Sequence, residues 1–158
     1  MRYLLDGYNL LFFLIDSKNS FAAQRQKIIR FLQILFSRHK MNGILIFDGR
    51  VRYEEESGRS YPSPLEVVYT SEGQSADEYI IERIENLKTP AKITVVTNDR
   101  ALMTNAKSLK AQTVNISKFI NWLTVRKKSK EFKPSTVETK YNTERLLKIF
   151  EKRLEENN

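Results

Sequence analysis

The 158-residue chain contains no cysteine, which excludes a disulfide framework and a zinc site built from thiolates. It contains one histidine, His39, so a nuclease that uses two histidines as acid and base is also excluded. The five glycines are scattered, and no phosphate-binding loop of the Walker A type is present. The longest apolar run near the start covers residues 10–15, too short to span a membrane. These absences predict a soluble, cytoplasmic protein.

Basic residues are in excess, and they are unevenly distributed. The chain has 27 Lys and Arg against 19 Asp and Glu, a net charge of +8. Residues 1–100 carry 14 basic and 13 acidic residues, whereas residues 101–158 carry 13 basic and 6 acidic residues. Such a basic segment is typical of nucleic-acid binding, and a solubilising surface is the alternative. The side chains predicted to contact RNA phosphates are Arg50, Arg52, Arg59, Arg126, Lys127, Lys128, Lys130 and Lys133.

Short apolar segments alternate with amphipathic ones along the chain. We predict strands at residues 3–5, 44–47, 65–69, 92–97 and 112–115, with the third at an edge of the sheet. Helices are predicted at residues 22–38, 76–87, 100–106 and 117–126. Ser75 and Glu78 form a capping-box pattern, and Ser117 is the predicted cap of the last of these helices. This alternation predicts a parallel α/β sheet covered by helices on both faces.

The chain divides into three predicted parts. Residues 1–126 form the catalytic domain, which includes a polar surface loop at residues 49–64. Residues 127–142 have little apolar content and form a basic linker. Residues 143–158 have apolar residues at helical spacing and form a final amphipathic helix.

Four aspartates occupy similar positions relative to these elements. Asp6, Asp48 and Asp99 each come at or just after the end of an apolar strand, and Asp77 stands where a helix begins. Each alone has an ordinary explanation in a turn or a helix start. Together they would converge on the edge where open α/β sheets bind ligands. Carboxylates packed so closely repel one another, and a hard cation such as Mg²⁺ or Mn²⁺ removes that cost.

A carboxylate-bound metal suits the hydrolysis of phosphoesters, because it lowers the pKa of an attacking water and neutralises charge on the phosphate. Asn9 and Asn98 could orient such a water or a phosphate, or could close turns. Glu78 could support the metal site or complete the capping box, and Ser75 is more simply a cap. We assign His39 to the exposed end of a helix. The aromatic residues considered for stacking on bases are Tyr8, Tyr53, Tyr61 and Trp122, of which Trp122 fits the core better.

Four segments resemble the YacP-like NYN domain family of the PIN-like nuclease superfamily. They are Asp6-Gly7-Tyr8-Asn9, Phe47-Asp48, the stretch from Tyr69 to Glu78, and Thr97-Asn98-Asp99. The resemblance covers about residues 2–126, and the basic linker and final helix are also similar to that family. It departs from the family's pattern at Asn98, where serine is more usual.

The resemblance implies a PIN-like three-layer sandwich with a five-stranded parallel sheet in the order 3-2-1-4-5, plus a C-terminal helical extension. It implies a metal-dependent endoribonuclease using Mg²⁺ or Mn²⁺, with mRNA as substrate and the ribosome as partner. Asp6, Asp77 and Asp99 would bind the metal and, with Asp48, carry catalysis. The supporting residues would be Asn9, Asn98, Glu78 and Ser75.

Two other functions remain as alternatives. One is a non-catalytic RNA- or ribosome-binding protein that has kept the fold. The other is a metal-dependent phosphatase for a small phosphoester. An aspartyl-phosphate enzyme would usually have Asp-x-Asp after the first strand, whereas Gly7 and Tyr8 follow Asp6 here. The basic C-terminal third also favours a polymer over a small substrate.

Overall fold

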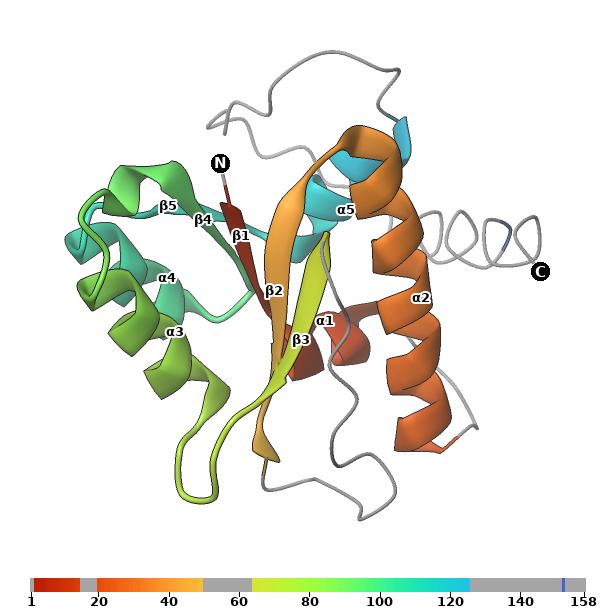
Figure 1. The fold of residues 1–158 in the computed structure, drawn as a ribbon, viewed down its shortest axis with the longest axis horizontal. Helices are drawn as coiled ribbons and strands as arrows, with labels where there is room; N and C mark the ends of the chain where they lie inside the picture. Colours follow the sequence, from red (N-terminus) through yellow and green to blue (C-terminus); the bar gives the residue numbers. More distant parts are fainter. Residues whose placement is uncertain (1, 15–19, 50–63, 126–151, 153–158) are drawn as a thin grey trace.

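The computed structural model describes residues 2–14, 20–49, 64–125 and 152. Within these residues, five parallel strands form one sheet in the order β3-β2-β1-β4-β5 (Figure 1). The strands are β1 (Arg2–Asp6), β2 (Asn42–Phe47), β3 (Leu65–Tyr69), β4 (Ile93–Val96) and β5 (Gln112–Val114). The α/β class, the parallel sheet and its strand order are confirmed.

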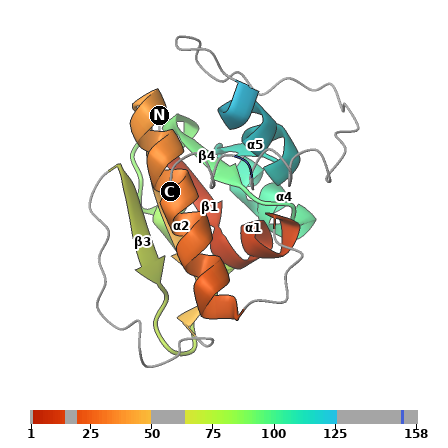
Figure 2. The same cartoon turned by 90° about the vertical axis from the view of Figure 1, so that its right-hand side faces the viewer.

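Helices cover both faces of the sheet. The helices are α1 (Gly7–Leu14), α2 (Phe21–His39), α3 (Ala76–Glu85), α4 (Arg100–Ser108) and α5 (Ile116–Val125), with a 3₁₀ turn η3 (Pro90–Lys92). In Figures 1 and 2, α1, α2 and α5 lie on one face of the sheet, and α3 and α4 lie on the other. The fold is thus the expected three-layer arrangement.

Neighbouring residues of the central strands β1 and β2 belong to two separate cores. Leu5 and Leu45 pack into the core under α1, α2 and α5, whereas Leu4 and Ile44 pack into the core under α3 and α4. All four are at most 1% exposed. Successive side chains of a strand point to opposite faces, so a strand buried on both faces needs a continuous apolar run. This is why the central strands were recognisable in the sequence.

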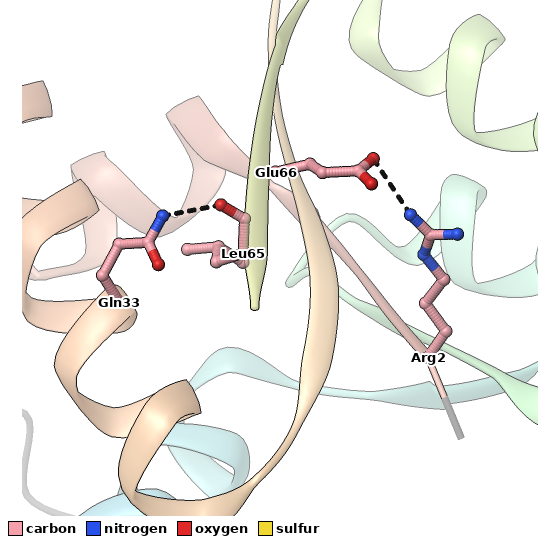
Figure 3. A network of polar contacts seen from close by, with 4 residues as sticks. All are labelled: Arg2, Gln33, Leu65 and Glu66. Atoms are coloured by element: carbon pink, nitrogen blue, oxygen red, sulfur yellow. Dashed lines mark hydrogen bonds and ion pairs between the residues drawn. The ribbon is translucent and has the colours of Figure 1, made fainter. Parts of the chain in front are cut away.

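The strand β3 lies at one edge of the sheet, as predicted. Figure 3 shows polar contacts on both of its faces: Gln33 of α2 donates to the Leu65 carbonyl (2.7 Å), and Glu66 pairs with Arg2 (2.9 Å). Arg2 belongs to β1, so this ion pair reaches across β2. Both of its side chains are more than a third exposed, so the pair contributes at most about 1 kcal/mol.

The helix α1 was not expected from the sequence. Its buried residues are Gly7, Leu10, Leu11 and Leu14, which share one face of the helix. The tight fit at its start explains the glycine, since a Cβ on Gly7 would lie 2.5 Å from the Phe47 ring and 2.6 Å from the Ile46 carbonyl oxygen. The short stretch was not identified because its apolar residues also resemble a continuous run.

Two caps were tested by the structure, with different outcomes. The capping box of α3 is confirmed: the Ser75 hydroxyl accepts from the Glu78 amide (3.1 Å), and the Glu78 carboxylate accepts from the Ser75 amide (2.8 Å). The predicted cap of α5 by Ser117 is wrong. The Asn115 side chain accepts from the Lys118 amide (2.8 Å) and from the Ser117 hydroxyl (3.1 Å), so Asn115 caps this helix.

His39 also differs from its expected exposed position. It ends α2, but it is half-buried, and its Nε2 donates to the Leu123 carbonyl of α5 (2.9 Å). Its ring lies 6.4 Å from that of Trp122, which packs against the core as predicted. This histidine therefore joins two helices.

Several predictions fall outside the described residues. They concern most of the loop at residues 49–64, the linker at 127–142 and the helix at 143–158, apart from Gly49, Pro64 and Lys152. All eight predicted phosphate contacts, and the aromatic residues Tyr53 and Tyr61, also lie there. Among the described helices, none combines the length and apolarity needed to cross a membrane.

Candidate functional site

The centre of the candidate site is Asp6, the last residue of β1. Its side chain is only 7% exposed. Its Oδ1 accepts a hydrogen bond from the Asn9 amide (3.2 Å), as an N-cap residue does at the start of a helix, here α1. Its Oδ2 accepts from the Thr97 hydroxyl (3.2 Å). Both carboxylate oxygens are therefore oriented by the protein.

Burial raises the pKa of Asp6 from 3.8 to about 6. The hydrogen bonds from Asn9 and Thr97 oppose this rise, whereas the negative charges of Asp77 and Asp99 add to it. Charges act in this way only over short distances inside a protein. Asp6, Asp77 and Asp99 thus lie within electrostatic reach of one another, although they come from three separate segments of the chain.

Asp99 stands just beyond β4 and caps α4. Its Oδ1 accepts from the Leu102 amide (2.9 Å). The buried Thr97 hydroxyl accepts from the Asp99 amide (3.0 Å) while it donates to Asp6. Thr97 therefore connects the two acidic residues directly, a role that the sequence analysis missed. The only sequence signal was a β-branched polar residue where an apolar strand ends.

The two asparagines extend this polar network. The Asn9 side-chain oxygen accepts from the Asn98 amide (3.0 Å), and the Asn98 side-chain oxygen accepts from the Ile116 amide (2.9 Å). These bonds join α1, the loop after β4 and the start of α5. Neither bond closes a local turn, because the bonded residues lie 89 and 18 positions apart in the sequence, so both side-chain oxygens instead join distant segments of the chain. Each side chain also carries an NH₂ donor group.

Asp77 lies in the first turn of α3 and is half-buried. Burial raises its pKa, and the charges of Asp99 and Glu78 raise it further. It lines one end of a groove of about 630 Å³ between α3 and α4. The other acidic residues of this groove are Glu78, Glu82 and Glu85. Negative charge therefore continues from the candidate site along α3.

Asp48 is the first residue after β2 and is half-buried. The next residue holds the neighbouring loop in place: the Gly49 amide donates to the Thr70 hydroxyl (2.9 Å), which donates to the Gln74 carbonyl (2.7 Å). A Cβ on Gly49 would lie 1.9 Å from the Thr70 carbonyl oxygen, so the backbones approach too closely for any other residue. Asp48 thus shares the carboxyl edge of the sheet with Asp6, one strand away.

Comparison with known proteins identifies the family. The sequence model of the YacP-like NYN domain matches residues 3–158, nearly the whole chain. The chain belongs to this family. The recognised resemblance is therefore confirmed, and the family match extends beyond the residues on which it was based.

Two solved structures have the same fold. A crystal structure of Rae1 (YacP) from Bacillus subtilis is 20% identical to this chain, with a TM-score of 0.65. The match covers 99% of this chain and 81% of that one. A single-residue mutant of Rae1 is 23% identical, with a TM-score of 0.61, over 77% of this chain and 74% of that one. No curated protein sequence matches significantly. The family and its fold support a ribonuclease at the level of the family.

A divalent metal ion is typical of this nuclease family. Among the described residues, no group of three or more His, Cys, Asp or Glu side chains is placed to hold a metal ion together. The donor chemistry still suits a hard cation, because Asp6, Asp77 and Asp99 supply only carboxylate oxygens. Mg²⁺ usually keeps several waters and binds through one or two carboxylates. The residues present fit such a partly hydrated ion.

Proposed function

We propose that this chain is a metal-dependent endoribonuclease that hydrolyses phosphodiester bonds in RNA, with mRNA as its substrate and the ribosome as its partner. The proposed location is the cytoplasm. The observation that supports it best is Asp6: a buried carboxylate, with a pKa raised to about 6, beside the charges of Asp77 and Asp99. In a chain of the YacP-like NYN family, this arrangement fits an acidic centre that binds cations.

In this proposal, Asp6, Asp77 and Asp99 hold Mg²⁺ or Mn²⁺, and Asp48 contributes a further catalytic carboxylate. Such an ion supplies a water of lowered pKa and neutralises charge on the phosphate. Thr97 and the Asn9 amide keep the Asp6 carboxylate in one orientation.

The polypeptide itself also favours an anion at this edge. The helices α1, α3 and α4 all begin there, at the residues that follow or flank the three acidic side chains. Helix N-termini carry partial positive charge and amide donors, which stabilise a bound phosphate.

The test is cleavage of a labelled RNA with Mn²⁺ or Mg²⁺, with and without a chelator. Wild type should cut the RNA only with the metal ion, and a circular RNA should also be cut if the attack is internal. Asp77→Asn should lower the rate by at least about tenfold, because it removes one charge that holds the ion. Glu85→Gln is the matched control, since it removes one charge from the same helix two turns further on.

Equal rates for wild type and Asp77→Asn, or cleavage that persists in the chelator, would contradict the assignment. The alternative of a non-catalytic RNA- or ribosome-binding protein makes a different prediction. In that case wild type binds RNA without cutting it, and Asp77→Asn binds at least as tightly because a repulsive charge is lost.

A further inference from the structure

Aromatic side chains form a continuous series beside the candidate site. The rings of Tyr69, Phe47, Tyr8, Phe12 and Phe21 follow one another, with centroids 5.6, 5.2, 6.2 and 6.0 Å apart. These distances are typical of direct aromatic contact. The series crosses from β3 through β2 and α1 to the first residue of α2.

The series begins in the core and ends in solvent. Phe47 is fully buried, and Tyr8 and Tyr69 are half-buried. Phe12 is 65% exposed and Phe21 is 42% exposed, and Leu87 is the only other large apolar side chain so exposed among the described residues. Two exposed aromatic rings in contact cost solvation free energy, which a bound partner would recover.

The aromatic series is directly connected to the acidic residues. Tyr8 follows Asp6 by two residues, and Phe47 immediately precedes Asp48. Phe12 lies five residues beyond Gly7, about 7.5 Å along the helix axis. This length equals about two steps of a stacked nucleic-acid strand, at roughly 3.4 Å each. A base on Phe12 would therefore belong to a nucleotide close to a phosphate at Asp6.

Charge indicates the direction in which a polyanion would leave the acidic centre. The helix α3 carries four acidic residues and one basic residue, so it repels phosphates. The helices α1 and α2 contain no acidic residue, and α2 carries four arginines and lysines, three of which, Lys27, Arg30 and Arg38, are exposed. A path over α1 and α2 is therefore favourable, and these helices lie on one face of the sheet (Figures 1 and 2). It leads past the exposed rings of Phe12 and Phe21, whose centroids are 6.0 Å apart.

We propose that Phe12 and Phe21 form a stacking site for an unpaired nucleobase of the RNA, next to the phosphodiester at the acidic centre. This inference rests on the proposed function. Every base has a π-face, so such a site tolerates different sequences but requires a base that is not paired. The site therefore selects single-stranded or locally opened RNA.

The test measures RNA binding in chelator, where cleavage does not interfere. A short intact single-stranded RNA is compared with a series of RNAs of the same sequence. Each RNA of the series carries one abasic nucleotide, at a different position. For wild type, one or two abasic positions should weaken binding by about tenfold. Phe12→Ala should weaken binding of the intact RNA by a similar factor and should not weaken binding of that abasic RNA further, because both changes remove the same contact.

Three variants distinguish base stacking on an aromatic ring from a nonspecific apolar contact and from a loss of folding. Phe12→Trp should restore the discrimination against the abasic RNA, whereas Phe12→Leu should not. Leu87→Ala removes a comparably exposed apolar side chain elsewhere and should change nothing. Thermal melting should be unchanged in all of them, since Phe12 lies mainly in solvent.

The proposal is overturned if Phe12→Ala weakens both RNAs equally, weakens neither, or changes the oligomeric state while RNA binding stays the same. It is also overturned if wild type binds no RNA. Failure of the proposed function gives a different result. If wild type binds RNA in a base-dependent way but shows no metal-dependent cleavage, the nuclease proposal is refuted and the stacking site stands. If Phe12→Ala cleaves and binds RNA as wild type does, the stacking site is refuted and the nuclease proposal stands.

Discussion

Replacing Asp6 with asparagine tests the electrostatics of the candidate site most directly. The change removes the negative charge and keeps the shape of the side chain. The amide oxygen of asparagine can still accept from the Asn9 amide, and its NH₂ group can donate toward Thr97. Any change in stability therefore reports mainly on the buried charge.

The expected size follows from the pKa of Asp6, which burial raises from 3.8 to about 6. The folded protein then holds this proton more tightly than the unfolded chain does. Stability must therefore fall as the pH rises from about 3.8 to about 6, and the loss is complete above that range. At roughly 1.4 kcal/mol per pKa unit, the ionised carboxylate costs about 3 kcal/mol. Little of this is screened, because the side chain is 7% exposed.

Urea denaturation in chelator, over a series of pH values from 3.5 to 8, measures this cost. At pH 7.5 the Asp6→Asn protein should be more stable than wild type by about 1 to 3 kcal/mol. At pH 3.5 the two should be nearly equal, since Asp6 is then protonated. Added Mn²⁺ should stabilise wild type by mass action and stabilise the variant much less.

The control is Glu85→Gln, which removes an exposed carboxylate and should change stability by less than about 0.5 kcal/mol at every pH. The reasoning is refuted if Asp6→Asn is no more stable than wild type at pH 7.5. It is equally refuted if both proteins lose stability in parallel between pH 4 and 6, since the titrating group would then lie elsewhere.

Two further predictions concern the Thr97 hydroxyl between Asp6 and Asp99, and the basic segment that contains Lys127, Lys128 and Lys130. Thr97→Val removes the hydroxyl between Asp6 and Asp99, so urea denaturation at pH 7.5 should show a loss of about 1 to 3 kcal/mol, and Thr97→Ser should largely restore it. A triple alanine variant of the basic segment should weaken RNA binding and reduce its log–log salt slope by about 0.7 per lost phosphate contact, with the fold unchanged. An unchanged salt slope would instead show that these side chains only solvate the chain. The residues replaced are Lys127, Lys128 and Lys130.

The sequence predicted the layers of the fold because that information is local. A strand buried on both faces needs an unbroken apolar run, and a helix with one buried face needs apolar residues at helical spacing. The apolar run at residues 44–47 was therefore recognised as the buried part of β2, and Ser75 and Glu78 were recognised as the cap of α3. Such patterns depend on neighbours within one or two turns of the chain.

The two failures have different causes. The cap of α5 is Asn115 rather than Ser117. Both residue types can cap a helix, and the end of β5 at Val114 decides that Asn115 takes this position. His39 is held by the Leu123 carbonyl, which lies 84 residues away in the sequence. The partner of His39 is therefore not visible in a local pattern, whereas the cap of α5 is a local contact whose choice between two residues the pattern left open.

The sequence alone determined that acidic residues end or follow the strands, and the order of apolar and amphipathic segments determined that those strands form a parallel sheet. Only the tertiary structure decided that the charges of Asp77 and Asp99 raise the pKa of Asp6, and that Thr97 joins Asp6 to Asp99. It also decided that Phe12 and Phe21 meet in solvent. The physical reason is that desolvation and Coulomb interactions depend on distance in space, which the sheet sets for residues up to 93 positions apart.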